Sequence, residues 1–301
     1  YQPGAICFID YPGFNLRISG WAKQSGYKTI YYISPQVWAW KESRVKTIRS
    51  DVDKMLVILP FEKEFYHKWN YEVDYVGHPL VEVIAAFRNS PASRSFPDII
   101  YSAKHKASVD RPLIALLPGS RKQEILKKLP VMLEASRAFP DYQFVVAEAP
   151  GQEDSFYDEI LKKYPEAGRV RNQTYALLNH AQAACVTSGT ATLETALFGV
   201  PEVICYKGSA ISYQIAKKLI KVKYISLVNL IMDKPVVKEL IQDEMTAANI
   251  VTELKKLLHD PEADRRIRQD YADLKELLSQ GGNASEKAAE IIVGYLKNNT
   301  A

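Results

Sequence analysis

Short apolar runs alternate with longer stretches of helical periodicity along most of the chain, and this alternation restricts the fold more than any other feature. Ala5–Ile9 and Leu113–Leu117 have the length and composition of buried strands, and an amphipathic stretch follows each of them. Strands that alternate with helices form parallel sheets that helices cover. We therefore predict an α/β protein. The further predicted strands are Thr29–Ile33, Met55–Leu59, Phe144–Val146, Ala183–Thr187 and Glu202–Tyr206, with a short strand that ends at Tyr75–Val76.

The alternation is interrupted once and then restarts, which predicts two domains. Residues 96–110 lie in a stretch with Ser, Pro, His and Lys and little periodicity, so we predict a linker there. The predicted domains are residues 1–95 and 111–280, with a C-terminal helix at 281–301. After Ser209 the sequence predicts an almost wholly helical chain. Two such sheets in tandem would leave a cleft, and ligands bind beyond the carboxyl ends of parallel strands.

Composition argues against several classes of protein and site. No apolar run reaches the roughly 18–20 residues that a membrane-spanning helix needs. A net charge of +4 does not by itself indicate a nucleic-acid partner. Cys7, Cys185 and Cys205 have neither disulfide nor zinc spacing, and their apolar neighbours predict buried thiols.

Two strand-to-helix turns have the composition of anion-binding sites. The first contains Gly119, Ser120 and Arg121. Glycine lets the backbone approach a ligand closely, free amides at a helix start favour an anion, and an arginine fork suits phosphate oxygens. The alternative is a plain turn that Ser120 caps, with a solvated arginine, and spacing alone does not decide between the two.

The second turn contains Ser188, Gly189 and Thr190, and Glu194 lies one helical turn farther on. Small side chains, hydroxyls and amides suit a diphosphate, and a carboxylate on the same helix face suits ribose hydroxyls. The alternative is a capped helix with an exposed glutamate. The two turns together favour a nucleotide site.

Other side chains follow the ends of strands in the first predicted domain. Asp10 could act as a general base or cap the helix that follows it. Trp38 could stack on a sugar, although its pattern favours the core, and His78 could contact a phosphate or complete a turn. Asp51 and Asp53 have the spacing of a metal-binding pair, but they precede a strand, so neither a metal nor a cofactor is predicted.

Seven segments together resemble the lipid-A-disaccharide synthases, and they follow the order found in that family. Their order and spacing cover nearly the whole chain, which makes the resemblance more specific than any single motif. The segments are Phe8–Asn15, Tyr32–Trp40, Leu59–Tyr66, Val76–Pro79, Leu116–Arg121, Ser188–Glu194 and Ser226–Leu230.

The resemblance implies a glycosyltransferase-B fold, in which two Rossmann-like domains face a cleft. It implies inverting transfer of 2,3-diacylglucosamine from its UDP derivative to 2,3-diacylglucosamine 1-phosphate, which yields the β-1,6-linked lipid A disaccharide and UDP. It also implies peripheral attachment to the cytoplasmic face of the inner membrane of a Gram-negative bacterium. The lysine-rich segment Ala216–Lys223 could contact anionic lipid there or be a solvated helix face.

The resemblance assigns roles to single residues. Asp10 matches the family's essential acidic position and would accept the proton of the acceptor 6-hydroxyl. The UDP-binding and active-site segments are matched by Gly119, Ser120, Arg121, Ser188, Gly189, Thr190, Glu194 and Asn229. Contacts to the acceptor or another ligand are implied for Asn15, Trp38, His78, Glu239 and Gln242.

The chain departs from the family in two respects. Family members begin with a further segment that carries the first strand and a glycine-containing loop, so we expect the N-terminal domain of this chain to be incomplete. Many members also have a second carboxylate where this chain has Gly13. Two alternatives stay open, an enzyme like the UDP-N-acetylglucosamine 2-epimerases and a non-catalytic UDP-sugar-binding fragment. A homodimer is open as well, and with an exchanged C-terminal part Asn229 would act in trans.

Overall fold

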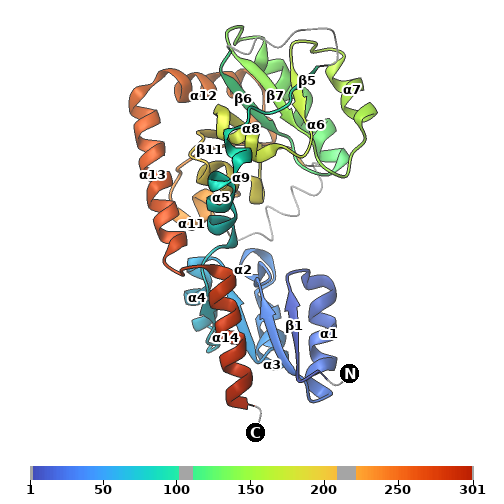
Figure 1. The fold of residues 1–301 in the computed structure, drawn as a ribbon, viewed down its shortest axis with the longest axis vertical. Coiled ribbons are helices and arrows are strands. Elements are labelled where there is room, and N and C mark those ends of the chain that lie inside the picture. The colour runs from blue at the N-terminus through green and yellow to red at the C-terminus, as the bar shows by residue number, and fades with distance from the viewer. Residues whose placement is uncertain (1–2, 102–110, 209–221, 300–301) are drawn as a thin grey trace. The chain divides into compact units, whose positions relative to one another are not determined.

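The strands form two sheets, and each sheet lies in a compact unit of its own (Figure 1). The computed structural model describes residues 3–101, 111–208 and 222–299. Of these, unit 1 contains residues 3–83, 222 and 275–299, and unit 2 contains residues 84–101, 111–208 and 223–274. Two helices, α5 (Pro79–Asn89) and α13 (Pro261–Ser279), pass from one unit to the other.

Unit 1 is a four-stranded parallel sheet in the order β1-β2-β3-β4, with helices on both faces. Its elements are β1 (Ala5–Ile9), α1 (Pro12–Gln24), β2 (Lys28–Tyr32), α2 (Val37–Trp40), α3 (Val45–Asp51), β3 (Lys54–Val57), α4 (Pro60–His67), β4 (Asp74–Tyr75) and α14 (Ala284–Asn299). Successive strand residues point to opposite faces. Tyr31 and Met55 therefore share a core with α1, α3 and α4, whereas Ile30 and Leu56 pack against α14.

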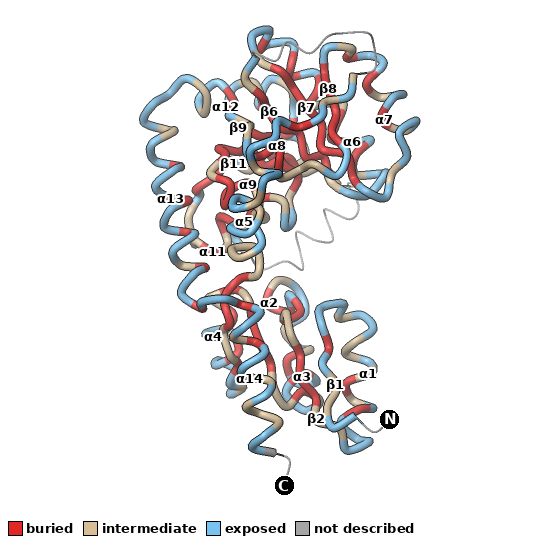
Figure 2. The backbone as a smooth tube through the Cα atoms, viewed as in Figure 1, coloured by how far each residue is buried: buried red, intermediate tan, exposed pale blue. Residues whose placement is uncertain are grey.

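Unit 2 is a seven-stranded sheet in the order β11-β10-β9-β6-β7-β8-β5, parallel except for β5. Its strands are β5 (Ile100–Tyr101), β6 (Leu113–Leu117), β7 (Gln143–Ala147), β8 (Gly168–Val170), β9 (Ala181–Thr187), β10 (Glu202–Tyr206) and β11 (Lys238–Ile241). Its helices are α6 (Lys122–Ser136), α7 (Asp154–Leu161), α8 (Thr174–His180), α9 (Thr190–Leu197), α11 (Leu227–Met232) and α12 (Ala247–His259). The central strands are almost entirely buried (Figure 2), which explains why they read as unbroken apolar runs.

The α/β class and the parallel sheets predicted from the sequence are confirmed. The prediction that the chain is almost wholly helical after Ser209 is wrong for Lys238–Ile241, which forms β11 beside β10. Four residues are too few for periodicity to distinguish a strand from a helix. The predicted elements also lacked β8 and α8.

The compact units divide the chain differently from the ranges predicted for the domains. The stretch 96–110, predicted as a linker, contains β5, which pairs antiparallel with β8 inside the sheet of unit 2. The helix predicted at 281–301 is α14, and it belongs to unit 1 because its apolar face covers that sheet. Cys185 and Cys205 are buried as predicted, but Cys7 is exposed and lies on the opposite side of β1 from the buried Phe8.

Candidate functional site

A pocket of about 370 Å³ opens at the carboxyl ends of β6, β7 and β9 in unit 2. Its lining comprises residues 117–120, 147–150 and 187–191, together with Glu124, Thr174 and Glu194. The chain continues from β6 to β7 on one side of β6, whereas β9 lies on the other side. The pocket therefore lies where the strand order reverses, which is where open α/β sheets bind ligands.

The turn after β6 forms the first wall of the pocket and leaves no room for a side chain. Gly119 has a φ of 108°, and a Cβ atom there would lie 2.9 Å from Oε2 of Glu124 and 3.3 Å from Cγ2 of Thr187. Only glycine tolerates both conditions without strain. The residue that precedes α6 is Arg121 rather than Ser120, and no side chain caps the helix. The amide of Glu124 donates to the carbonyl oxygen of Arg121 at 2.9 Å, so the amides that precede it in the first turn remain for a ligand.

The turn after β9 forms the second wall. Gly189 precedes α9 with a φ of 149°, and again no side chain caps the helix. The hydroxyl of Ser188 donates to the carbonyl oxygen of Ile225 at 2.7 Å, which fixes the turn against the segment before α11. Thr190 is exposed at the first position of α9. Both turns that the sequence singled out as anion sites therefore border one pocket.

Glu194 borders the same pocket from within α9. The hydroxyl of Tyr175 donates to its Oε1 at 2.8 Å. Burial and the hydrogen bond to this carboxylate raise the pKa of Tyr175, so the hydroxyl keeps its proton. One oxygen of Glu194 is thus held in place, while Oε2 has no hydrogen bond to any residue that the structure describes and can accept one from a ligand.

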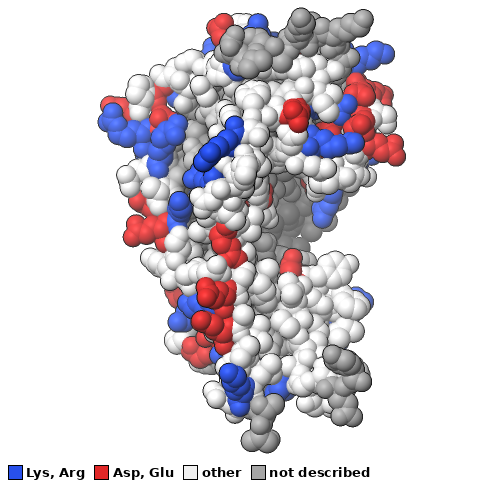
Figure 3. All heavy atoms as spheres, in the orientation of Figure 1, with Lys and Arg blue, Asp and Glu red and all other residues white. Residues whose placement is uncertain are grey.

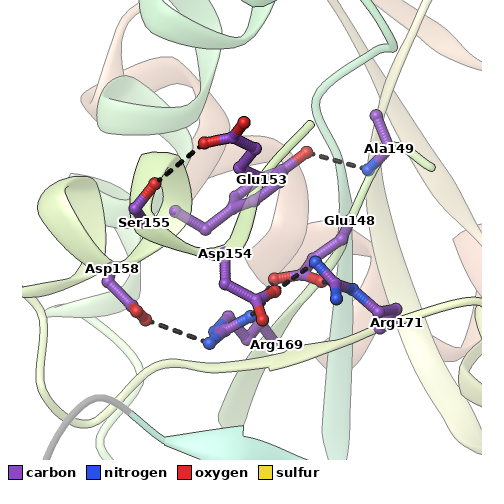
Figure 4. A network of polar contacts seen from close by, with 9 residues as sticks. Glu148, Ala149, Glu153, Asp154, Ser155, Asp158, Arg169 and Arg171 are labelled. Carbon is purple, nitrogen blue, oxygen red and sulfur yellow. Dashed lines mark hydrogen bonds and ion pairs between the residues drawn. The ribbon is translucent and has the colours of Figure 1, made fainter. Parts of the chain in front are cut away.

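The third wall carries a buried acid, Glu148, whose charge is matched by two arginines (Figure 4). Arg169 pairs with one carboxylate oxygen, and Nε of Arg171 lies 3.2 Å from the other. Asp154 and Asp158 of α7 pair with Arg169 at 3.1 and 3.0 Å. The side chain of Glu148 is 2% exposed, so an unpaired charge there would be costly and would repel an anion.

Asn229 and Glu239 do not border this pocket but support the segment that holds Ser188. The carboxylate of Glu239 accepts hydrogen bonds from the amide of Ser226 and from Nδ2 of Asn229, each at 2.9 Å. Asn229 is 1% exposed, and its side-chain amide also pairs with the backbone of Val237 at 2.9 Å in both directions. Both side chains thus tie the start of α11 to β11.

The candidate base Asp10 follows β1 in unit 1, and its backbone is held in an uncommon conformation. Asp10 and Tyr11 both have a φ of 45°, which non-glycine residues rarely adopt. The carbonyl oxygen of Asp10 accepts from Nδ2 of Asn15 at 2.7 Å and from the hydroxyl of Tyr31 at 2.6 Å. Tyr11, not Asp10, occupies the cap position of α1. Among the described residues, the carboxylate of Asp10 has neither a hydrogen bond nor an ion pair.

Trp38 and His78 are buried in unit 1, 7% and 6% exposed. Nε1 of Trp38 donates to Oε1 of Glu62 at 3.2 Å, and the ring packs edge-on against Phe61. Nδ1 of His78 accepts from the amide of Leu80 at 3.2 Å. Burial lowers the pKa of His78 to about 4, so its ring is neutral at pH 7. Both side chains thus have hydrogen-bond partners within unit 1.

The structure thus brings only part of the predicted site residues together. The pocket in unit 2 collects Gly119, Ser120, Ser188, Gly189, Thr190 and Glu194. Arg121 follows directly after the lining, and its side chain is 83% exposed. Gln242 lies apart from the lining, where its Oε1 accepts from the amide of Gly208 at 3.0 Å. Asp10, Asn15, Trp38 and His78 all belong to unit 1.

Sequence reasoning missed Glu148, Tyr175 and Lys128. Glu148 directly follows a strand that points at the pocket, so the rule that located the two turns could have found it. Tyr175 and Lys128 lie inside helices, and nothing in their spacing marks them.

Asp53 has structural partners on two neighbouring elements. Its carboxylate accepts from the amide of Thr29 at 2.9 Å and pairs with Lys23. No cluster of three or more His, Cys, Asp or Glu side chains suited to a metal ion occurs in the part of the chain that the structure describes. In the same part, no helix is both long and apolar enough to cross a membrane.

The chain is similar to known proteins over almost its full length. The family model for lipid-A-disaccharide synthetase matches residues 2–293. The lipid-A-disaccharide synthase of Syntrophus aciditrophicus is 40% identical over 302 residues, which cover 98% of this chain and 76% of that protein.

Two solved structures share the fold at low sequence identity. A UDP-GlcNAc 2-epimerase from Neisseria meningitidis superimposes with a TM-score of 0.64 at 11% identity, over 97% of this chain and 76% of that one. CalG4, the calicheamicin glycosyltransferase, superimposes with a TM-score of 0.57 at 16% identity, over 99% and 75%. These two show the glycosyltransferase-B fold alone. The family match and the identity to its members show that the chain belongs to the lipid-A-disaccharide synthase family and is a glycosyltransferase.

Proposed function

We propose that this glycosyltransferase moves 2,3-diacylglucosamine from its UDP derivative to 2,3-diacylglucosamine 1-phosphate. The acceptor 6-hydroxyl loses its proton to a carboxylate, and its oxygen attacks the anomeric carbon of the donor from the face opposite UDP. The bond from that carbon to the diphosphate oxygen breaks, and its electron pair leaves with UDP. The configuration inverts, which gives a β-1,6-linked disaccharide.

The pocket of unit 2 supports this proposal because its parts match a nucleoside diphosphate. Two uncapped helix starts offer amides to the diphosphate, Arg121 adds a positive charge, and Glu194 offers an oxygen to ribose hydroxyls. The similarly folded Neisseria epimerase was solved with UDP-GlcNAc bound. Charge that builds on the leaving UDP would be stabilised by these donors, so the proposed mechanism uses no metal ion.

Asp10 is the proposed base. Its backbone is held by Asn15 and Tyr31, while its carboxylate is left without a partner in the described structure. Burial and the nearby carboxylate of Asp10 raise the pKa of Tyr31 to about 12, so the tyrosine stays a donor. Residues in sparsely populated backbone conformations, such as Asp10 and Tyr11, cluster at functional sites.

The surroundings of Asp10 suit an acylated acceptor. Ile9, Tyr11 and Phe14 are 58%, 72% and 57% exposed and lie next to it in sequence. In the view of Figure 3, few charged side chains appear over β1 and α1. We extend the proposal to peripheral attachment of this face to the cytoplasmic side of the inner membrane. The lysine-rich segment Ala216–Lys223 lies outside the described residues except at its last two positions, and Lys223 pairs with Asp233 at 3.0 Å.

One assay tests the function. The protein is incubated with UDP-2,3-diacylglucosamine, with and without the acceptor, and UDP and disaccharide are followed by mass spectrometry. We expect equal amounts of UDP and disaccharide, only when both substrates are present, and the same rate after EDTA treatment. Conversion of the UDP-sugar without acceptor would indicate an epimerase, and UDP binding without turnover would indicate a non-catalytic module.

A further inference from the structure

The pocket proposed for the diphosphate is bordered by three carboxylates, which is unexpected for an anion site. They belong to Glu124, Glu148 and Glu194. A carboxylate close to a diphosphate repels it unless a cation compensates the charge or a hydrogen bond spreads it. Glu148 pairs with Arg169 and Arg171, which Asp154 and Asp158 also share, and Glu194 accepts a hydrogen bond from Tyr175. The remaining carboxylate is that of Glu124.

Glu124 is shared between two cations that differ strongly in exposure. Nη1 of Arg121 lies 3.4 Å from Oε1, and Nζ of Lys128 lies 3.6 Å from Oε2. The side chain of Arg121 is 83% exposed, whereas that of Lys128 is 3% exposed. Arg121 can therefore turn to a ligand at little cost, and Lys128 cannot.

Lys128 is fixed beneath the first turn of the pocket. Its ammonium donates a hydrogen bond to Oγ1 of Thr187, at the end of β9. Nζ also lies 3.5 Å from the position that a Cβ atom on Gly119 would take. The ammonium thus lies beneath the turn, where it contacts both Glu124 and Thr187 of the second wall. Burial lowers its pKa, and the carboxylate of Glu124 opposes that shift.

We propose that Lys128 is the permanent counter-ion of Glu124 and thereby releases Arg121 to bind the diphosphate of the donor. Lys128 is in this sense a positioning residue, since it acts through Glu124 and Arg121. Without it, Glu124 would compete with the phosphate oxygens for the guanidinium of Arg121. The inference rests on the proposed function, because it requires that the pocket binds UDP.

The test compares the binding of UDP and of uridine, which lacks phosphate, by ligand-observed NMR at fixed ionic strength. Lys128→Met should weaken UDP binding at least about tenfold, which corresponds to about 1.4 kcal/mol, and leave uridine binding within about twofold. Lys128→Gln keeps a donor for Thr187 and should behave like the methionine variant. Lys128→Arg keeps the charge and should bind UDP as the wild type does.

The decisive comparison uses the Glu124→Gln variant as its reference protein. Because Lys128 acts through Glu124, the double variant Lys128→Met, Glu124→Gln should bind UDP as Glu124→Gln alone does. If a single lysine variant fails to fold, this pair still gives the comparison. The inference is overturned if the lysine variants bind UDP normally, if they lose UDP and uridine alike, or if the lysine change still weakens UDP binding in the glutamine background. A wild-type protein that binds no UDP would instead contradict the proposed function.

Discussion

The side-chain nitrogen of Asn15 donates a hydrogen bond to the carbonyl oxygen of Asp10 at 2.7 Å. The same nitrogen lies 3.1 Å from the carbonyl oxygen of Ile9. One amide from α1 thus holds the last residue of β1 and the residue after it. This matters because Asp10 and Tyr11 occupy a backbone region that costs about 1–3 kcal/mol per residue and needs support from its surroundings.

Asp10→Asn should abolish most of the turnover. Asparagine tolerates the left-handed backbone, so the fold should survive, but its amide cannot accept the acceptor proton. We expect kcat to fall by about 10²–10⁴-fold, which is the usual contribution of a general base. UDP affinity, measured by calorimetry, should not change because the lining of the UDP pocket lies in unit 2. A fully active variant would remove Asp10 from the mechanism.

Asn15→Ala should lower kcat clearly, while it lowers the free energy of unfolding only slightly. The variant loses the hydrogen bonds that hold Asp10, at a cost of about 1 kcal/mol in the free energy of unfolding. A displaced base should reduce kcat by about tenfold, since small errors of position are costly in catalysis. Asn179→Ala is the matched control, because Nδ2 of Asn179 donates to the carbonyl oxygen of Ser93 at 2.9 Å in unit 2. Equal kcat in both variants would show that Asn15 has only a structural role.

Glu239→Gln and Asn229→Ala should disturb the same segment, so their effects on stability should not be additive. Each breaks the contacts that hold the segment before α11, and this segment accepts the hydrogen bond from Ser188. Each should lower the free energy of unfolding by about 1–3 kcal/mol and weaken UDP binding. The double variant should deviate from additivity by at least about 0.5 kcal/mol, as coupled residues do. Strictly additive effects in a urea-unfolding cycle would refute the shared role.

Two buried groups of unit 1 should contribute opposite slopes to the pH dependence of stability. Burial raises the pKa of Glu62 from 4.5 to about 7, so its contribution is full below pH 4.5 and is lost as the pH rises to about 7. Burial lowers the pKa of His78 from 6.5 to about 4, so its contribution is full above pH 6.5 and is lost as the pH falls to about 4.

Removing one of the two groups should make the pH dependence caused by the other visible in the free energy of unfolding. In Glu62→Gln the free energy of unfolding should fall by about 3 kcal/mol more than in the wild type between pH 6.5 and pH 4. In His78→Asn it should fall by a similar amount as the pH rises from 4.5 to 7. Asparagine keeps an acceptor for the amide of Leu80. Urea titrations at several pH values measure both slopes, and parallel curves for all three proteins would contradict the assignment.

Local signals predicted the strands and the turns of the pocket well, because each depends on a few neighbouring residues. The apolar run Leu113–Leu117 followed by Gly119 needs no distant information to indicate a strand and a tight strand-to-helix turn. The supports of the pocket could not be predicted in this way. Lys128 is close to Thr187 only because β6 and β9 are neighbours in the sheet. Pairings of this kind depend on strand order, which one sequence does not reveal.

The same limit explains why the roles of α14 and of Lys238–Ile241 were not evident from the sequence. Nothing in the apolar pattern of α14 indicates which surface it covers, and its contact with Ile30 and Leu56 joins residues more than two hundred positions apart. Lys238–Ile241 is similarly too short to be recognised as a strand until β10 provides its neighbour.

The return of α14 to the first sheet has a consequence for how the protein is made. A ribosome releases the N-terminal part of a chain first, and such parts often fold as soon as they emerge. Here one face of the β2–β3 core, with Ile30 and Leu56, lacks its cover until α14 leaves the exit tunnel. Loss of α14 would therefore damage the sheet that carries Asp10, more than two hundred positions earlier in the sequence.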